Sequence, residues 1–210
     1  MANHVYFNVT VDGNNECMKG FSSAMEMTSV ERKNWTGEGT MIVRELLDID
    51  KLKFMPEGTY DKDGYLEDSW NYYVENVGAK WCNVEDVEEN YFSGYSAWSA
   101  PLQFVQYLHE YLYDHHDKNH SIKMTYEDEF RNFMGKQYFD TEKWDDWESI
   151  EGECNETDGE ELVELFNEMY PSIDTTVEDF DWHAEYEVKG ESIYPSEMLD
   201  QLADEFWESV

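Results

Sequence analysis

The stretch from Trp70 to Leu112 constrains the fold more than any other part of the chain. Its first part places apolar and aromatic side chains at i, i+3, i+4, i+7 and i+11, which is one face of a helix. These residues are Trp70, Tyr73, Val74, Val77 and Trp81. Gly78 follows where a left-handed glycine commonly ends a helix. The spacing predicts a helix that ends near Gly78 and packs its aromatic face in the core.

The second part of this stretch predicts a strand followed by a helix. Tyr91–Trp98 has the composition of a strand, and Gly94 within it marks a bulge or a point of close packing. Ser99 lies near the expected N-cap and Pro101 near the first helical position, where these residue types are preferred. The helix is expected to end near His115. Its apolar residues are Phe104, Val105, Leu108, Tyr111 and Leu112.

Alternating apolar residues on both sides of this stretch predict further strands. They are Val5, Phe7, Val9 and Val11 before it, and Ile122, Met124 and Tyr126 after it. Phe130–Phe139 is the expected partner of the later strand, with a bulge at Gly135. Residues 14–26 favour a short helix or a loop, and residues 28–64 favour irregular structure with one short element near 41–47. Together these elements predict an α+β fold, a ferredoxin-like antiparallel sheet with helices packed on one face.

Two motifs in the central stretch resemble those of the YubB-type ferredoxin-like domain family of phage and plasmid accessory proteins. The first motif ends the predicted helix and reads ENVGAKW, Glu75–Trp81, after Trp70. The second reads YSAWSAP, Tyr95–Pro101, and opens the next helix. An acidic segment before a glycine, Glu127–Gly135, is similar to the later hairpin of the family. The resemblance covers residues 3–140. Within the two motifs, Val77, Ala79 and Ala100 differ from the usual family residues. It implies an origin in a mobile element and implies no catalytic residue.

Residues 141–210 form an acidic extension that is expected to pack on a first domain of residues 1–140. The extension holds 24 acidic residues against two lysines, a net charge of −22, and the first 140 residues carry the remaining −13 of the total of −35. Glu151–Gly159 is a polar joint, and Leu162–Met169 has the pattern of a helix that ends before Pro171. Phe180–Val188 alternates as a strand with an acidic outer face, and a last helix begins at Ser196.

The charge excludes several classes of partner. Direct nucleic-acid binding requires cationic groups that neutralise phosphates, and an anionic membrane surface disfavours an acidic protein for the same reason. Adaptation to high salt would also produce an acidic surface, although the chain has eleven lysines against three arginines and many Asn, Tyr and Met residues. The charge therefore favours a basic protein as the partner.

Catalytic and metal-binding patterns are weak, so we expect no enzyme activity, no cofactor and no metal. His115, His116, Asp117 and His120 form the one His/Asp cluster, and they are more consistent with a helix terminus than with a metal site. Cys17, Cys82 and Cys154 lie at wide spacings and are expected to be reduced thiols of a cytoplasmic protein, within the host cell. We also expect neither a signal peptide nor a transmembrane segment.

The acidic extension gives the strongest functional hypothesis, inhibition of a DNA-binding protein by DNA mimicry. Side chains four apart on a helix, or two apart on a strand, could place carboxylates at about every second phosphate of one DNA strand. The expected partner is a basic host protein of a restriction, BREX-like or CRISPR system, or a nucleoid protein. The candidate contact residues are Glu161, Glu164, Glu168, Asp181, Glu185, Glu187, Asp204 and Glu205.

Two other hypotheses remain open at this point. The aromatic surface of the first domain could bind a protein while the acidic residues only confer solubility, which would make the chain a non-enzymatic interaction module. An enzyme of unrecognised type would need a pocket with convergent polar groups. The sequence also leaves open whether the chain forms a homodimer.

Overall fold

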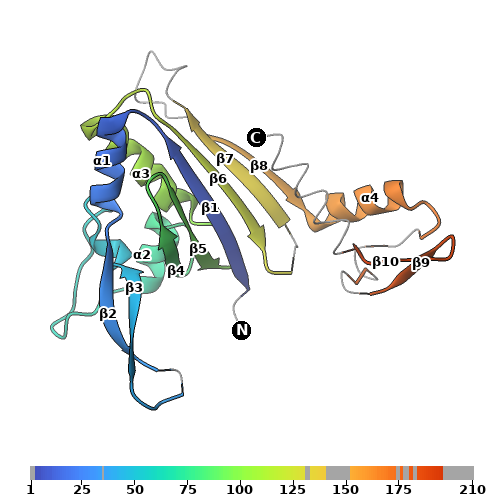
Figure 1. Ribbon diagram of the computed structural model, residues 1–210, viewed down its shortest axis with the longest axis horizontal. Helices are drawn as coiled ribbons and strands as arrows, with labels where there is room; N and C mark the ends of the chain where they lie inside the picture. The colour runs from blue at the N-terminus through green and yellow to red at the C-terminus, as the bar shows by residue number, and fades with distance from the viewer. Residues whose placement is uncertain are drawn as a thin grey trace.

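A six-stranded antiparallel sheet forms the centre of the protein in the computed structural model, which describes residues 3–34, 36–130, 133–140, 152–173, 176, 180–181 and 184–195 (Figure 1). In order across the sheet, the strands are β4 (Cys82–Val87), β5 (Tyr91–Ala97), β1 (His4–Asp12), β6 (Ser121–Asp128), β7 (Phe133–Asp140) and β8 (Gly152–Asp158).

Three helices lie on one side of this sheet, and a smaller unit lies beyond β8 (Figure 1). The three helices are α1 (Asn15–Ala24), α2 (Ser69–Asn76) and α3 (Leu102–His115). The smaller unit contains α4 (Gly159–Met169) and a hairpin of β9 (Tyr186–Val188) and β10 (Glu191–Ile193). The predicted α+β class is therefore confirmed. Among the described residues, no helix combines the length and apolar character needed to cross a membrane.

The core lies between the sheet and the helices that cover it. β1 buries Val5, Phe7, Val9 and Val11 almost completely, while the alternating residues Tyr6, Asn8 and Thr10 point to the open face. α3 turns Phe104, Val105, Leu108 and Leu112 toward the same core. The strand and helix patterns of these residues were predicted from their periods of two and 3.6.

Two glycines allow close approaches within the sheet. A Cβ atom on Gly94 would lie 2.0 Å from the carbonyl oxygen of Asn83 and 2.9 Å from the ring of Phe7, so close packing explains this glycine. The bulge lies instead on the neighbouring strand, between Val84 and Asp86. Gly135 pairs in regular register with Tyr126, whose ring occupies the space of a Cβ atom, so the predicted bulge at Gly135 is wrong.

The C-terminal end of α2 and the N-terminal end of α3 differ in part from the sequence prediction. Gly78 has a φ of +91° and ends α2 as predicted. Pro101 occupies the N-cap position of α3 rather than the first helical position, and no side chain caps this end. The hydroxyl of Ser99 donates 2.6 Å to the carbonyl oxygen of Gly78, so this serine ties the two helix ends together.

The aromatic face of α2 is not a core face. Trp70 is 47% exposed and Val74 is 45% exposed, while Val77, directly after the helix, is fully buried. Tyr73 packs partly against the core. Of this predicted face, Val77 lies in the core and accepts a hydrogen bond from the Phe104 amide of α3, whereas the predicted core packing of Trp70 is wrong.

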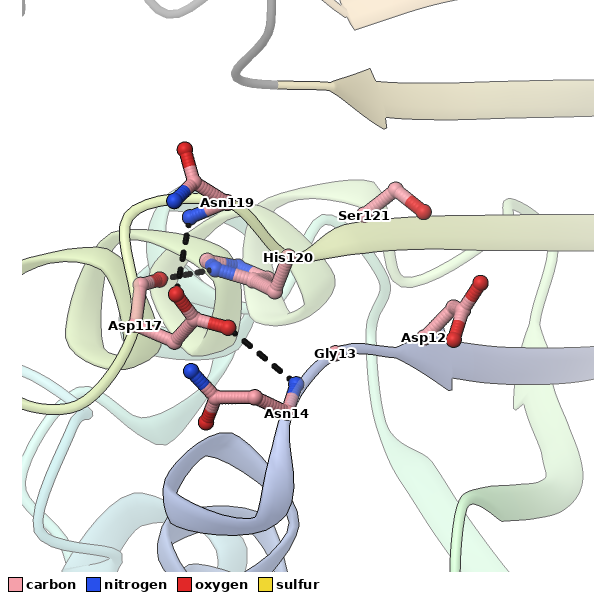
Figure 2. A pocket seen from close by; sticks show the side chains of 7 residues that line it. All are labelled: Asp12, Gly13, Asn14, Asp117, Asn119, His120 and Ser121. Carbon is pink, nitrogen blue, oxygen red and sulfur yellow. Dashed lines mark hydrogen bonds between the residues drawn. The ribbon is translucent and has the colours of Figure 1, made fainter.

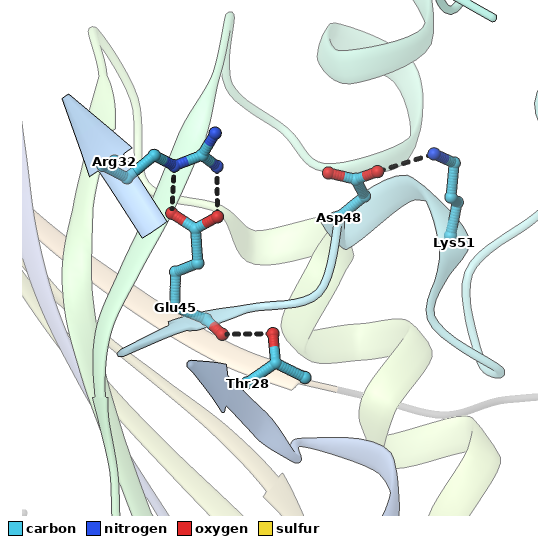
Figure 3. Close-up of polar contacts among 5 residues, drawn as sticks. All are labelled: Thr28, Arg32, Glu45, Asp48 and Lys51. Atoms are coloured by element: carbon cyan, nitrogen blue, oxygen red, sulfur yellow. Dashed lines mark hydrogen bonds and ion pairs between the residues drawn. The ribbon is translucent and has the colours of Figure 1, made fainter. Parts of the chain in front are cut away.

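A hairpin occupies much of the region that was expected to be irregular. Its strands are β2 (Met27–Lys33) and β3 (Thr40–Leu46), and only β3 coincides with the predicted apolar segment. Polar contacts reinforce the hairpin: Arg32 binds the Glu45 carboxylate with two nitrogens, and the Thr28 hydroxyl donates 3.3 Å to the Glu45 carbonyl oxygen (Figure 3). Because β2 is largely polar and exposed, hydrophobic periodicity did not reveal it.

The predicted polar joint at 151–159 contains a strand instead. β8 pairs with β7 along its length, from Phe133 opposite Asp158 to Phe139 opposite Gly152. An edge strand is held by backbone hydrogen bonds to one neighbouring strand. It can therefore form even where its side chains do not alternate between apolar and polar. β7 ends at the predicted domain boundary, residue 140, and β8 follows that boundary in the sequence. The pairing of the two strands therefore crosses the predicted boundary.

Replacing Gly94 with alanine should destabilise the protein by about 2–3 kcal/mol, because the added methyl group must displace the backbone of β4 or the ring of Phe7. Urea denaturation measures the change. Ser93→Ala, on the other face of β5, is the control and should change stability little. Equal stability of both variants would contradict the close packing described above.

Candidate partner-binding surface

A small aromatic cluster supports the acidic end of the described chain. Phe166 of α4 is fully buried, and its ring centroid lies 4.9 Å from that of Phe180, 5.6 Å from that of Tyr186 and 5.2 Å from that of Tyr170. Phe180 and Tyr186 stack with an interplanar angle of 20°. These four residues are called the C-terminal aromatic cluster, and they hold α4 to the segment that leads into β9.

Exposed carboxylates surround this cluster. Glu164 and Glu168 lie four residues apart on α4 and are both exposed, while Val163 and Phe166 of the same helix are buried. Asp181, Glu185 and Glu187 are exposed on the segment that contributes Phe180 and Tyr186. Glu161 belongs to α4, but its side chain lies outside the described residues, as do Asp204, Glu205 and the predicted final helix.

The predicted strand over Phe180–Val188 is mostly wrong. Among the described residues of this range, only the last three form a strand, since β10 provides three pairing partners after the tight turn at Lys189–Gly190. Both turn residues have positive φ angles, 55° and 85°, which is the conformation of a two-residue hairpin. The Ala184 amide donates 3.1 Å to the Asp181 carbonyl oxygen, so the chain turns before β9. Asp181 therefore does not continue a strand face with Glu187, and regular spacing survives only on α4.

The acidic surface differs from the rest of the molecule in its ion pairs. Within the described part of the chain, the ion pairs found join His4 to Glu129, Lys19 to Glu16, Arg32 to Glu45 and Lys51 to Asp48. All of them lie before residue 130, and two are drawn in Figure 3. None of these ion pairs involves Glu164, Glu168 or Glu187, whose side chains are exposed to solvent.

A polar hollow of about 530 Å³ lies where β1 runs into α1 and the α3–β6 turn approaches it (Figure 2). It is lined by Asp12, Gly13, Asn14, Asp117, Asn119, His120 and Ser121.

Its most buried acid, Asp117, is 8% exposed and already has structural partners. The carboxylate accepts hydrogen bonds from the amides of Asn14, at 3.2 Å, and Asn119, at 3.0 Å. These bonds fix the two turns to one another, which accounts for the buried carboxylate without a catalytic role.

The His/Asp cluster does not converge on one point. His115 ends α3 and is exposed, and His116 contacts the hydroxyl of Tyr111 at 3.3 Å. His120 is buried, and its Nδ1 donates 2.6 Å to the carbonyl oxygen of Asp117. His116 and His120 are not on a common helix because α3 ends at His115. Among the described residues, no group of three His, Cys, Asp or Glu side chains is placed to hold a metal ion.

Cys17 is buried and Cys82 is partly buried, and both are free thiols. Burial raises the pKa of the Cys17 thiol to about 11, and the nearby charges of Asp117 and Asp12 raise it further in the same direction. Burial also raises the pKa of the Cys82 thiol. A thiol with a raised pKa carries little of the thiolate that acts as a nucleophile, so both residues are structural.

Comparison of the chain with protein-family models, with curated proteins and with solved structures finds no match. The resemblance to the YubB-type domain therefore remains a prediction based on the quoted motifs.

Sequence patterns did not indicate one exposed cluster, which is formed by Trp70, Lys80 and Trp98. Trp98 lies on the surface at 48% exposure, directly after β5, and contacts Trp70 of α2. Helical and strand periods place these residues on elements that are distant in sequence, so no local pattern indicates that they meet.

Phe166→Ala should loosen α4 from β9 and cost about 3–5 kcal/mol locally, because Phe166 fills the centre of the C-terminal aromatic cluster. Amide hydrogen exchange should become faster in α4 and β9 and stay unchanged in β1 and β6. Met169→Ala, at an exposed position of the same helix, is the control. Unchanged exchange in α4 would show that the cluster does not support it.

His120 should make stability decrease on acidification. Burial lowers the pKa of His120 below its ordinary value of 6.5, so below that pH the unfolded chain binds a proton more readily than the folded protein. Its contribution is fully present above pH 6.5 and is lost as the pH falls toward the folded pKa. Urea denaturation of wild type and His120→Gln at pH 7.5 and 5.5 isolates this effect. The variant should lose less stability than wild type between the two pH values, and an equal loss would contradict the assignment.

Proposed function

We propose that this protein is a phage or mobile-element accessory protein that inhibits a DNA-binding host protein by presenting carboxylates in place of DNA phosphates. The observation that carries the proposal is the set of exposed carboxylates on a folded support, Glu164, Glu168, Glu185 and Glu187 around the C-terminal aromatic cluster. No chemical step is involved, and the inhibitor acts by occupying the cationic groove of its target.

Spacing and order both favour this mechanism. Glu164 and Glu168 are separated by one helical turn, a rise of about 6 Å, and phosphates of one DNA strand advance about 3.4 Å per step. The pair therefore approximates alternate phosphates. Because α4 is already folded and anchored by Phe166, its side chains lose less conformational entropy on binding than those of a disordered acidic tail.

Long-range electrostatics would accelerate the encounter. The total charge of −35 attracts a basic surface, and its concentration in the last third of the chain orients the approach. The targets that this chemistry fits are restriction, BREX-like and CRISPR proteins and nucleoid proteins, which all carry basic DNA-binding grooves.

The mobile-element origin and the finer fold assignment belong to the same proposal. The strands β4, β5, β1 and β6 lie side by side in the order that a ferredoxin-like domain uses, with helices in the connections from β1 to β4 and from β5 to β6. This order supports a ferredoxin-like domain of the YubB type, with the hairpin β2–β3 inserted and β7 and β8 added at one edge.

Two variants, each with four acidic side chains replaced by neutral amides, test the proposal. The first carries Glu164→Gln, Glu168→Gln, Glu185→Gln and Glu187→Gln. The matched control removes four exposed charges from β4 and the turn that follows it, with Glu85→Gln, Asp86→Asn, Glu88→Gln and Glu89→Gln. The protein is used to capture a basic DNA-binding protein from bacterial lysate, and duplex DNA releases the captured target. The target is then purified, and a gel shift measures how well wild type and each variant displace it from DNA. The first variant should inhibit about tenfold less than wild type, and the control should inhibit nearly normally.

Salt dependence provides the second measurement. Affinity for the purified target should fall steeply between low and physiological ionic strength, because many charge pairs contribute. An affinity that is indifferent to salt, or equal inhibition by both variants, would contradict DNA mimicry.

A non-enzymatic protein-interaction module is the second candidate, and the exposed aromatic residues favour it. Tyr6, Trp70 and Trp98 are each between 44% and 48% exposed, Tyr6 on the open face of the sheet and the two tryptophans in contact with one another at α2 and the end of β5. If this surface carries binding and the acids only confer solubility, the variant with four neutralised C-terminal glutamates keeps full affinity for its partner.

A further inference from the structure

Two half-exposed tryptophans enclose a lysine at the junction of α2 and β5. The ring centroids of Trp70 and Trp98 lie 5.6 Å apart at an angle of 66°. The Nζ atom of Lys80 lies 4.7 Å from the Trp70 ring and 4.6 Å from the Trp98 ring. We call these two indoles the tryptophan clamp. Both distances are within the range of a favourable cation–π interaction, so the clamp already holds a cation.

The backbone holds Trp98 in an unfavourable conformation. Its φ of +70° lies in the left-handed region, where a bulky residue is a genuine outlier. Three hydrogen bonds maintain this turn. The Trp98 amide donates 3.0 Å to Asn3, and the hydroxyls of Ser96 and Ser99 each donate 2.6 Å, to the carbonyl oxygens of Ser99 and Gly78.

A purely structural role does not account for the exposure of the rings. A tryptophan that stabilises a core is buried, whereas these two residues are each about half exposed. Residues held in sparsely populated backbone conformations concentrate at ligand clamps, where the surrounding structure fixes the geometry in advance. The two serines and the main chain of Asn3 provide such a frame here.

We propose that the tryptophan clamp is a binding site for the guanidinium group of an arginine side chain of a basic partner, and that Lys80 occupies the site in the free protein as an exchangeable substitute. Arginine fits better than lysine because its planar, weakly hydrated guanidinium stacks on aromatic faces. Lys80 is tethered on a flexible stem and can leave toward solvent when the arginine enters. The negative charge of the protein favours any cationic side chain at its surface.

This site lies apart from the acidic surface and does not depend on DNA mimicry. The clamp is formed by α2, Lys80 and the end of β5, whereas the carboxylates of that proposal lie around α4 and β9. The acidic surface presents several carboxylates to a broad basic surface, while the clamp supplies a shaped site for one side chain.

Binding of N-butylguanidinium at constant ionic strength tests the site in the full-length protein. The indole N–H signals of Trp70 and Trp98, assigned with Trp70→Leu and Trp98→Leu, should shift saturably in a two-dimensional NMR spectrum. N-butylurea, which has a similar shape and no charge, should produce no saturable shift. Absence of a shift with the cation, or an equal shift with the urea, would overturn the proposal.

Lys80→Gln decides whether Lys80 is a substitute ligand. Removing it should tighten butylguanidinium binding roughly three- to fivefold, because the clamp is then open in a larger fraction of molecules. Lys118→Gln is the matched control, since Lys118 lies 5.2 Å from the single ring of Tyr113, and it should leave binding unchanged. Weaker or unchanged binding in Lys80→Gln would overturn the exchange.

Two further variants separate the clamp from the general field of the protein. Trp70→Leu removes one ring at an exposed helical position and should weaken binding at least fivefold while the other amide signals keep their positions. Neutralising Glu164, Glu168, Glu185 and Glu187 should leave the affinity for butylguanidinium unchanged. Loss of binding in the glutamate variant would assign the cation to the acidic surface and overturn the clamp.

Discussion

The pairing of β1 on both sides is the interaction on which the rest of the structure depends. β1 forms antiparallel ladders with β5 and with β6, so residues from positions 4 to 12 join segments that follow more than 80 and more than 100 residues later. Its buried side chains Val5, Phe7, Val9 and Val11 then form the floor on which α1 and α3 pack. The placement of the tryptophan clamp also follows from this pairing, because the amide of Trp98 binds Asn3 just before β1 begins.

The distribution of charge explains how such an acidic chain remains folded. Apolar residues fill the space between the sheet and α3, and the described acidic residues lie mainly on turns, on the hairpin and around α4. Repulsion between exposed charges is screened by water and salt over about 10 Å at 0.1 M ionic strength. The few buried acids have dedicated donors, as Asp117 has from Asn14 and Asn119. The surface can therefore carry charge far beyond the needs of solubility without placing it in the core.

Sequence patterns predicted the elements that combine a clear period with burial. β1, β6 and α3 were predicted because one face of each is uniformly apolar, and Gly78 ended α2 because only its backbone tolerates the required φ angle. β2 and β8 were missed, since a polar strand is held by backbone pairing that leaves no side-chain pattern. Of the described residues in the strand predicted over 180–188, only 186–188 form a strand, because β10 pairs with these three. Of the candidate contacts, those on α4 keep their spacing, whereas the meeting of Trp70, Lys80 and Trp98 depends on tertiary packing that no local pattern contains.

The bulge in β4 has a consequence for contacts between copies of the protein. β4 is the last strand on its side of the sheet, and the register shift between Val84 and Asp86 interrupts the row of backbone groups that this edge presents. Exposed Glu85 and Asp86 lie at the same point. A second copy that approached edge to edge would meet both a broken ladder and four carboxylates of like charge. This edge therefore keeps neighbouring copies from joining into a continuous sheet.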